Sequence, residues 1–200
     1  MTRVIEVPGQ ATSAERILTT ALDLFAIKGY DATSVREICE AAGITKPTLY
    51  HFFGSKDGVL QALVHTGFQQ YRTLVNAAMD TPGSFKDRVE VLARAVFHSA
   101  SSKPRFWRFI NSVIWAPPGT ALPQTESCTQ FYDGVVGVLA AAAEKAVGRG
   151  EIAPGPTKAR MLIVMGSISE AATGFVIAGK PKLTPELADE IVETIFNGWR

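Results

Sequence analysis

The chain has 200 residues, of which 46% are hydrophobic, 20% charged and 9% aromatic, a composition typical of a soluble globular protein. Twenty basic residues against nineteen acidic ones leave a formal net charge of +1, so overall charge does not indicate a nucleic-acid or membrane partner. Cys39 and Cys128 lie far apart and there are only three histidines, which argues against a disulfide framework and a zinc site. We expect no metal and no cofactor, although a site made only of carboxylates is left open.

The first two predicted helices are marked by side chains that can cap their N-termini. Thr12 is followed three residues later by Glu15, and Ser34 by Glu37, which is the spacing of a capping box. Apolar residues recur at helical intervals after each box. Gly29 follows the first helix, where glycine most easily adopts a left-handed cap. We therefore expect helices at about 13–28 and 34–42.

A third, short helix is predicted after Gly43, which ends the second helix. Thr45 can cap it, Pro47 falls in its first turn, where the missing N–H of proline costs no hydrogen bond, and Gly54 ends it. Prolines and glycines then separate long stretches of helical periodicity, and no stretch alternates as a strand does. We expect an all-α fold, with further helices at about 57–79, 84–101, 103–115, 123–148, 157–179 and 184–199.

Residues 34–53 thus read as a helix, a glycine-bearing turn and a second short helix. The stretch from about residue 11 to 71 resembles the DNA-binding region of the TetR family of bacterial transcriptional repressors (TetR/AcrR type). The resemblance implies a three-helix helix-turn-helix head at 12–56 after a flexible arm at 1–11, and an all-helical ligand-binding and dimerisation body at 57–200. It rests on Ala14–Leu18, Ala21, Leu24, Phe25, Gly29, Tyr30, Thr33–Ile38, Ala42–Phe53, Ser55 and Lys56.

The third helix carries the residue types that a DNA-reading helix needs. A short helix fits the major groove of duplex DNA, and its N-terminal turn meets the base edges. Lys46 can donate to guanine, the Thr48 methyl group can pack on a thymine methyl, and the polar tips of Tyr50 and His51 suit phosphate contacts. The resemblance assigns base readout to Arg36, Lys46, Pro47 and Thr48, and phosphate contact to Thr33, Ser34, Thr45, Tyr50, His51 and Lys56.

Two features of the head restrain this interpretation. Between Thr12 and Leu60 there are five basic and six acidic residues, so DNA binding must depend on local placement, and its salt dependence should be shallow. Phe52 stands where the family often has His or Tyr, and a phenyl ring cannot donate to a phosphate.

Residues 85–135 are rich in bulky aromatic side chains with polar ones between them. Such a pattern suits an ordinary helical core as well as a small-molecule pocket. The resemblance implies a pocket in this region for an unidentified, largely apolar effector. We expect its lining among Phe97, His98, Phe106, Trp107, Ile110, Asn111, Trp115 and Phe131.

The last two helices carry more apolar surface than a single buried face requires. In 157–179 a stripe of large apolar residues, beginning at Met161, runs beside a stripe of small ones, and the final helix is apolar over a broad face. An intrachain core or a four-helix seam between two chains would both explain this, and the resemblance favours a homodimer. The expected interface residues are Ser167, Ala171, Gly174, Ala178, Ile191, Ile195 and Trp199.

These observations predict a sequence-specific DNA-binding regulator, a repressor that a small molecule releases from a palindromic operator. The alternatives are an all-helical binding protein or enzyme whose helix-turn-helix is only structural, and a non-specific architectural DNA binder, which near-neutral charge disfavours. G-x-S-x-G, P-loop, H-E-x-x-H and G-x-G-x-x-G motifs are absent, so we expect no enzyme. Residues 1–11 lack a signal-peptide apolar region, so we expect a cytoplasmic protein. Glu170 interrupts the apolar stretch 160–180, so we expect a buried helix there and no membrane partner.

Overall fold

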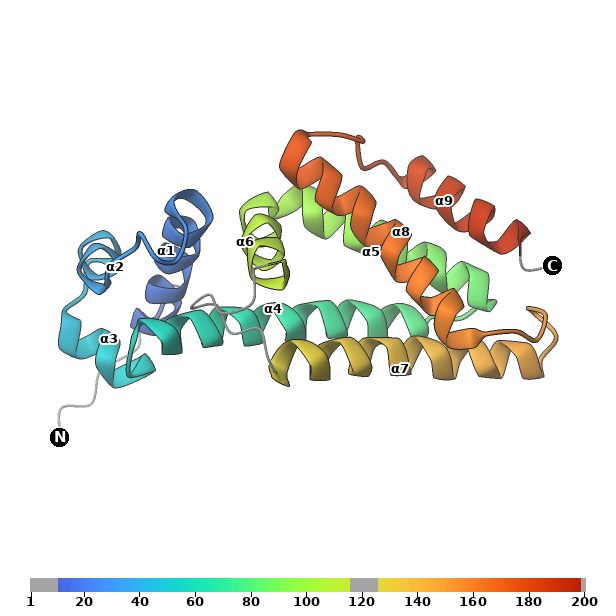
Figure 1. Cartoon of the computed structure of the whole chain (residues 1–200), viewed down its shortest axis with the longest axis horizontal. Coiled ribbons are helices and arrows are strands. Elements are labelled where there is room, and N and C mark those ends of the chain that lie inside the picture. Colours follow the sequence, from blue (N-terminus) through green and yellow to red (C-terminus); the bar gives the residue numbers. More distant parts are fainter. Residues whose placement is uncertain (1–10, 116–125, 199–200) are drawn as a thin grey trace.

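The computed structural model describes residues 11–115 and 126–198. Within these residues the chain forms helices and no strand, which confirms the predicted all-α fold (Figure 1). All but the last residue of the predicted arm at 1–11, and Trp199, lie outside the described residues. The helices are α1 (Ser13–Lys28), α2 (Val35–Ala42), α3 (Lys46–Phe53), α4 (Lys56–Met79), α5 (Phe85–Ser102), α6 (Pro104–Ile114), α7 (Glu126–Gly148), α8 (Thr157–Ala178) and α9 (Pro185–Asn197).

Local capping explains where the first helices begin and end. Both predicted capping boxes are formed, with Thr12 and Glu15 at the start of α1 and Ser34 and Glu37 at the start of α2. Gly43 follows α2 with φ +62° and ψ +43°, a left-handed conformation that costs glycine little, and so the chain turns directly into α3.

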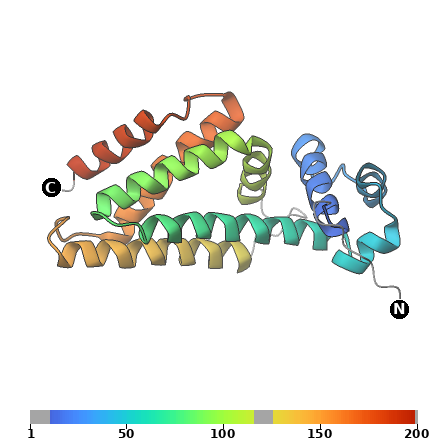
Figure 2. The same cartoon turned by 180° about the vertical axis from the view of Figure 1, so that it is seen from behind.

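The helices form an elongated molecule with the head at one end. Figure 1 shows α1, α2 and α3 grouped together, and α4 running from them along the body beside α7. Figure 2, the same structure seen from behind, shows α5 above α4 and α9 at the end of the molecule farthest from the head. Helix α6 lies between α1 and the rest of the body in both views.

Two apolar cores hold this arrangement together, and α4 belongs to both. Val59 and Leu60, near the start of α4, are fully buried in the core under the head, whereas Val75, farther along, is buried in the core of the body. Helix α6 also reaches the head, because Phe109 and Val113 are buried in the same core as α1. The core of the head therefore continues past residue 56 into two helices of the body.

Helix α8 is the one helix among the described residues that is long and apolar enough to cross a membrane by length and composition. Its stripe of large apolar side chains packs into the core of the body, as expected from the sequence. Met161, Met165, Ile168 and Ala172 are buried and Phe175 is half-buried. The apolar character of α8 is therefore accounted for on this side by packing inside the protein.

Two valines on α5 allow a matched test of the body core. Val89 is fully buried, whereas Val91 is 37% exposed. We expect Val89→Ala to lower the free energy of unfolding by about 2 kcal/mol, because it removes buried methyl groups and leaves a cavity. The same change at Val91 should cost less than about 0.5 kcal/mol. Urea denaturation followed by circular dichroism measures both, and equal losses would contradict the packing of α5.

Candidate DNA-binding surface and effector cavity

Helix α3 is anchored by one side chain and presents the rest of its first turns to solvent. Leu49 is fully buried in the core of the head. Lys46, Pro47, Tyr50 and His51 are exposed. The leading edge of the predicted reading helix therefore faces outward, as a DNA-binding role requires.

The N-terminus of α3 is held by a threonine pair. The Thr45 hydroxyl accepts a hydrogen bond from the Thr48 amide at 3.4 Å, and the two hydroxyl groups share a hydrogen bond of 2.8 Å. Thr45 is exposed and Thr48 is half-buried. The pairing fixes the Thr48 side chain beside the helix start, where backbone N–H groups favour an anionic phosphate.

Two residues predicted to contact phosphate hold the loop before α2. Thr33 is buried, and its hydroxyl donates to the Gly29 carbonyl at 2.8 Å, so the predicted phosphate contact of this side chain is wrong. The Lys56 ammonium donates to the carbonyls of Tyr30 at 3.0 Å and Thr33 at 2.9 Å, and lies 4.1 Å from the centre of the Tyr30 ring. The Tyr30 hydroxyl in turn donates to Asp57. Lys56 thus fixes this loop while it stays half-buried, and its contact with a DNA phosphate stays a prediction.

Lys46 is the one lysine or arginine side chain between residues 12 and 60, all of them described, that makes no hydrogen bond or ion pair. It lies exposed at the first position of α3. Because the other cations are already engaged, Lys46 is the charge most available to DNA. The engaged cations are Arg16 with the carbonyls of Ala42 and Gly43, Lys28 with Glu37, Arg36 with Glu40, and Lys56 with the carbonyls named above.

The other polar or aromatic residues near the predicted reading surface are exposed, but several of their side chains already contact a neighbour. The Ser34 hydroxyl is exposed but exchanges hydrogen bonds with Glu37 in the capping box. Arg36 is exposed and pairs with Glu40 at 2.6 Å, a contact it would have to leave in order to reach DNA. The ring of Phe52, which is 48% exposed, packs edge-on against His51 with the ring centres 5.3 Å apart.

A cavity of about 350 Å³ opens between α4, α6, α7 and α8. It contains six of the eight predicted lining residues. Phe97 and His98 are not among them, because α5 turns Phe97 into the core of the body and His98 toward solvent, while Ser99 reaches the cavity. The predicted residues that do line the cavity are Phe106, Trp107, Ile110, Asn111, Trp115 and Phe131.

Sequence reasoning missed the contributions of α4 and α8 to this cavity. Phe68 and Tyr71 from α4, and Ser169 and Glu170 from α8, lie far along the chain from the aromatic stretch in which we expected the pocket. Gly67 was the available signal. A Cβ there would lie 2.6 Å from Phe106 Cζ, so glycine in mid-helix marks the close approach of α4 and α6.

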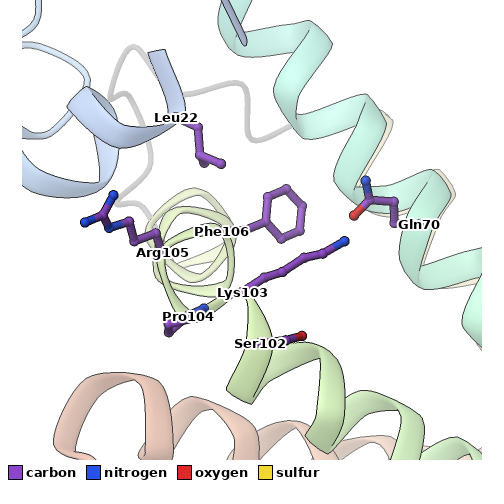
Figure 3. A pocket seen from close by; sticks show the side chains of 7 residues that line it. All are labelled: Leu22, Gln70, Ser102, Lys103, Pro104, Arg105 and Phe106. Carbon is purple, nitrogen blue, oxygen red and sulfur yellow. The ribbon is translucent and has the colours of Figure 1, made fainter. Parts of the chain in front are cut away.

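A second cleft lies on the other side of Phe106, against the head. It has a volume of about 410 Å³, is lined by Leu22 of α1 and by the start of α6, and shares Gln70 and Phe106 with the larger lining of the first cavity. Figure 3 shows Lys103 and Phe106 extending into the cleft and Arg105 turned away from it toward α1. Arg105 pairs there with Asp23 at 3.0 Å, which ties α6 to the head.

The predicted dimer residues lie along the junction of α8 and α9. Ser167, Ala171 and Gly174 are half-buried and Ala178 is exposed. Ile191 and Ile195 are half-buried against the core of the body. Beside them α8 exposes large apolar side chains that no residue of the described chain covers, namely Ile163 at 52% and Ile177 at 68%. Their contact with a second chain stays a prediction.

The comparison with known proteins agrees with this geometry. Residues 17–63 match the family model described as bacterial regulatory proteins of the tetR family. The HTH-type transcriptional repressor KstR2 of Rhodococcus jostii (strain RHA1) is 30% identical over 148 residues, which are 72% of each chain. The chain belongs to the TetR family. It is therefore a DNA-binding transcriptional regulator of the TetR repressor type and not an enzyme.

Solved TetR-family structures share the fold. The fatty acid degradation regulator FadR of Bacillus halodurans superposes with a TM-score of 0.81 at 18% identity, over 96% of this chain and 98% of that one. FadR of Bacillus subtilis, solved in complex with stearoyl-CoA, gives 0.78 at 19% identity, over 92% and 98%. At these identities the likeness shows the fold alone.

Among the described residues of the present chain, no group of three or more His, Cys, Asp or Glu side chains is placed to hold a metal ion.

The single free cation of the head makes Lys46 a sharp test of the DNA-binding surface. We expect Lys46→Gln to weaken operator binding by about 1–3 kcal/mol, and to reduce the salt slope of binding by about one, while leaving thermal stability unchanged. Lys56→Gln is the matched control and should lower the melting temperature, because two buried carbonyls lose their donor. Fluorescence anisotropy at several salt concentrations measures the first effect and thermal unfolding the second. Equal operator binding by native protein and Lys46→Gln would contradict this assignment.

The capping box of α2 predicts a pH dependence of stability. Hydrogen bonds from Lys28 and then from Ser34 lower the pKa of Glu37 from 4.5 to about 2. Since the folded pKa lies below the unfolded one, the stabilisation is complete above pH 4.5 and is lost as the pH falls toward 2. Melting temperatures across this window should fall less steeply in Glu37→Gln than in the native chain, with Lys28→Gln between them. Parallel curves for all three proteins would show that Glu37 has no such role.

Proposed function

We propose that this TetR-family chain acts as a homodimeric repressor that binds a palindromic operator and is released by a small-molecule effector. The observation that carries the DNA-binding part is the outward edge of α3, where Lys46 is exposed and unpaired while Leu49 anchors the helix from beneath. Base readout falls to Lys46, Pro47 and Thr48, and to Arg36 once it leaves Glu40. Phosphate contacts fall to Ser34, Thr45, Tyr50 and His51.

The dimer is supported by the surface of α8 and α9. Ile163 and Ile177 stand exposed on one face of α8, with the exposed Glu170 between them and the small residues Ser167 and Ala178 beside them. Small side chains let helix backbones approach closely, and exposed isoleucines on the same face supply apolar area to bury. A two-fold axis across this face would pair α8 and α9 with their copies and set two α3 helices on successive major grooves.

The effector couples to the head through α4 and α6. Phe106 and Asn111 of α6 line the cavity, and Phe109 and Val113 of the same helix are buried in the core of the head. The rings of Phe109 and Phe25 of α1 lie 6.1 Å apart between centres. A ligand that favours a different position of α6 therefore favours a different position of α1, in proportion to its differential affinity for the two states.

In this scheme residues 12–56 form the DNA-binding domain and 57–200 the regulatory body, with α4 common to both. The effector is largely apolar, since aliphatic and aromatic side chains together form most of the cavity wall. The stearoyl-CoA complex of Bacillus subtilis FadR supports the view that this fold accommodates an apolar group. A protein whose target is chromosomal DNA acts in the cytoplasm.

The operator itself is the first experiment. Fragments of genomic DNA from the source organism are incubated with the purified protein, and the bound ones are sequenced and footprinted. We expect enrichment of a short palindrome protected over two successive major grooves. A protein that enriches no sequence, or protects DNA without sequence preference, would favour the structural helix-turn-helix or the architectural binder instead.

Substitution of the exposed face of α8 tests the dimer. We expect Ile163→Arg to give a monomer with weakened operator binding, because two charges would meet across the two-fold axis and the heads would lose their linkage. Val91→Arg places the same side chain on the exposed side of α5 and is the control, which should remain a dimer. Analytical ultracentrifugation distinguishes the states. Sedimentation of Ile163→Arg as a dimer would exclude this seam.

A further inference from the structure

The chemistry of the cavity is more specific than its apolar character, and this inference rests on the proposed effector site. The described lining includes no lysine, arginine or histidine, and it includes one carboxylate, Glu170. Of the cations on neighbouring parts of α6, Arg105 is paired with Asp23 and Arg108 donates to the Val176 carbonyl, while Lys103, just before α6, borders the second cleft and is exposed. An anionic group inside the cavity would therefore meet a like charge and no cation, which makes its transfer from water unfavourable.

One hydrogen-bond donor on the cavity wall lacks a partner. Among the described residues, two buried side-chain nitrogens make no hydrogen bond, Arg88 Nε and Asn111 Nδ2, and Asn111 belongs to the cavity lining. The other end of its amide is occupied, because Oδ1 accepts from the Thr173 hydroxyl at 3.3 Å. A buried N–H without an acceptor is unfavourable, and an acceptor in the cavity would remove that penalty.

Two other polar groups of the wall are paired within the chain. Trp107 Nε1 donates to the Ser99 hydroxyl at 3.1 Å, and the Tyr71 hydroxyl is hydrogen-bonded to Ser169. To reach an acceptor in the cavity, Asn111 turns about χ2, which meets only a low barrier, and gives up the 3.3 Å bond from Thr173. Gln70 and Tyr132 also line the cavity without a partner in the described chain, but both are exposed to water, so Asn111 is the wall residue whose unpaired donor is buried.

The aromatic walls indicate the shape of the occupant. The rings of Phe68 and Phe131 stack with their centres 4.2 Å apart, and Tyr71 meets Phe131 edge-on at 5.6 Å. Phe106, Trp107 and Trp115 complete the lining. Flat faces and edges of this kind contact a planar ring system over a large area.

We infer that the cavity takes an uncharged, planar ring compound that carries a hydrogen-bond acceptor, and that Asn111 determines this specificity by donating to the acceptor through Nδ2. Glu170 adds to the selection by disfavouring anions. The position of Asn111 on α6, five residues after Phe106 and on the helix that also packs against the head, places recognition on the element that would transmit it.

Three tricyclic probes of nearly the same shape test the inference: fluorene, 9-fluorenone, which adds one carbonyl acceptor, and fluorene-9-carboxylate, which adds a negative charge. Equilibrium dialysis gives their dissociation constants. For the native protein we expect 9-fluorenone to bind about three- to tenfold more tightly than fluorene, the ratio that one hydrogen bond supplies, and the carboxylate to bind most weakly.

Variants assign the effects to residues. Asn111→Leu, of similar size, should bind fluorene as before and lose the preference for 9-fluorenone. Asn111→Asp, which keeps the acceptor for Thr173 but not the donor, should lose the same preference. Glu170→Gln should strengthen binding of the carboxylate and leave the other two probes unchanged.

The contrary outcomes are distinct. The inference is overturned if the native protein binds fluorene and 9-fluorenone with equal affinity, or if Asn111→Leu keeps the preference for 9-fluorenone. It is also overturned if the carboxylate binds most tightly, or if no probe binds up to its solubility. Operator binding of the same samples is measured in parallel. If the native protein binds no operator, the proposed repressor function fails, whereas probe selectivity still decides the chemistry of the cavity.

Discussion

The position of the DNA-binding head depends on apolar surface that the head does not itself contain. A unit as short as residues 12–56 buries too little area to be stable alone. Its core is completed by Val59, Leu60 and neighbouring residues of α4, and by Phe109 and Val113 of α6. Because α4 and α6 also form walls of the cavity, the head rests on the two helices that an effector touches. The same packing that stabilises the reading helix thus makes its position sensitive to the contents of the body.

This arrangement also explains how a head with slightly more acidic than basic residues can serve a DNA-binding protein. Most of its cations stabilise the fold, as when Lys56 bonds the carbonyls of the loop before α2. Lys46 alone of those between residues 12 and 60 is left unpaired, and it lies at the N-terminus of α3, where the exposed backbone amides add to its attraction for phosphate. Affinity in such a head comes from placement and from pairing two heads, more than from total charge.

Much of this was readable from local sequence. Capping boxes at Thr12 and Ser34, glycine at Gly43 and the proline in the first turn of α3 act within a few residues of the structure they specify, so the head helices and their boundaries were predicted correctly. The spacing of Met161, Met165 and Ile168 likewise placed one face of α8 in the core. The residues that resemble the TetR family lie in these same helices and turns, and they indicated a DNA-binding regulator.

Contacts between distant segments were decided only by the tertiary structure. Thr33 and Lys56 have the residue types of phosphate ligands, but Thr33 is buried with its hydroxyl on the Gly29 carbonyl, and Lys56 bonds two backbone carbonyls of the loop before α2. Phe97 looked as suitable for a pocket as Phe106, and the rotation of α5 put it in the core. The cavity is lined by residues of both α4 and α8, and its first and last lining residues are about a hundred positions apart in the sequence. Side-chain type and helical period act locally, whereas the direction in which each helix faces its neighbours follows from burying all the apolar faces at once.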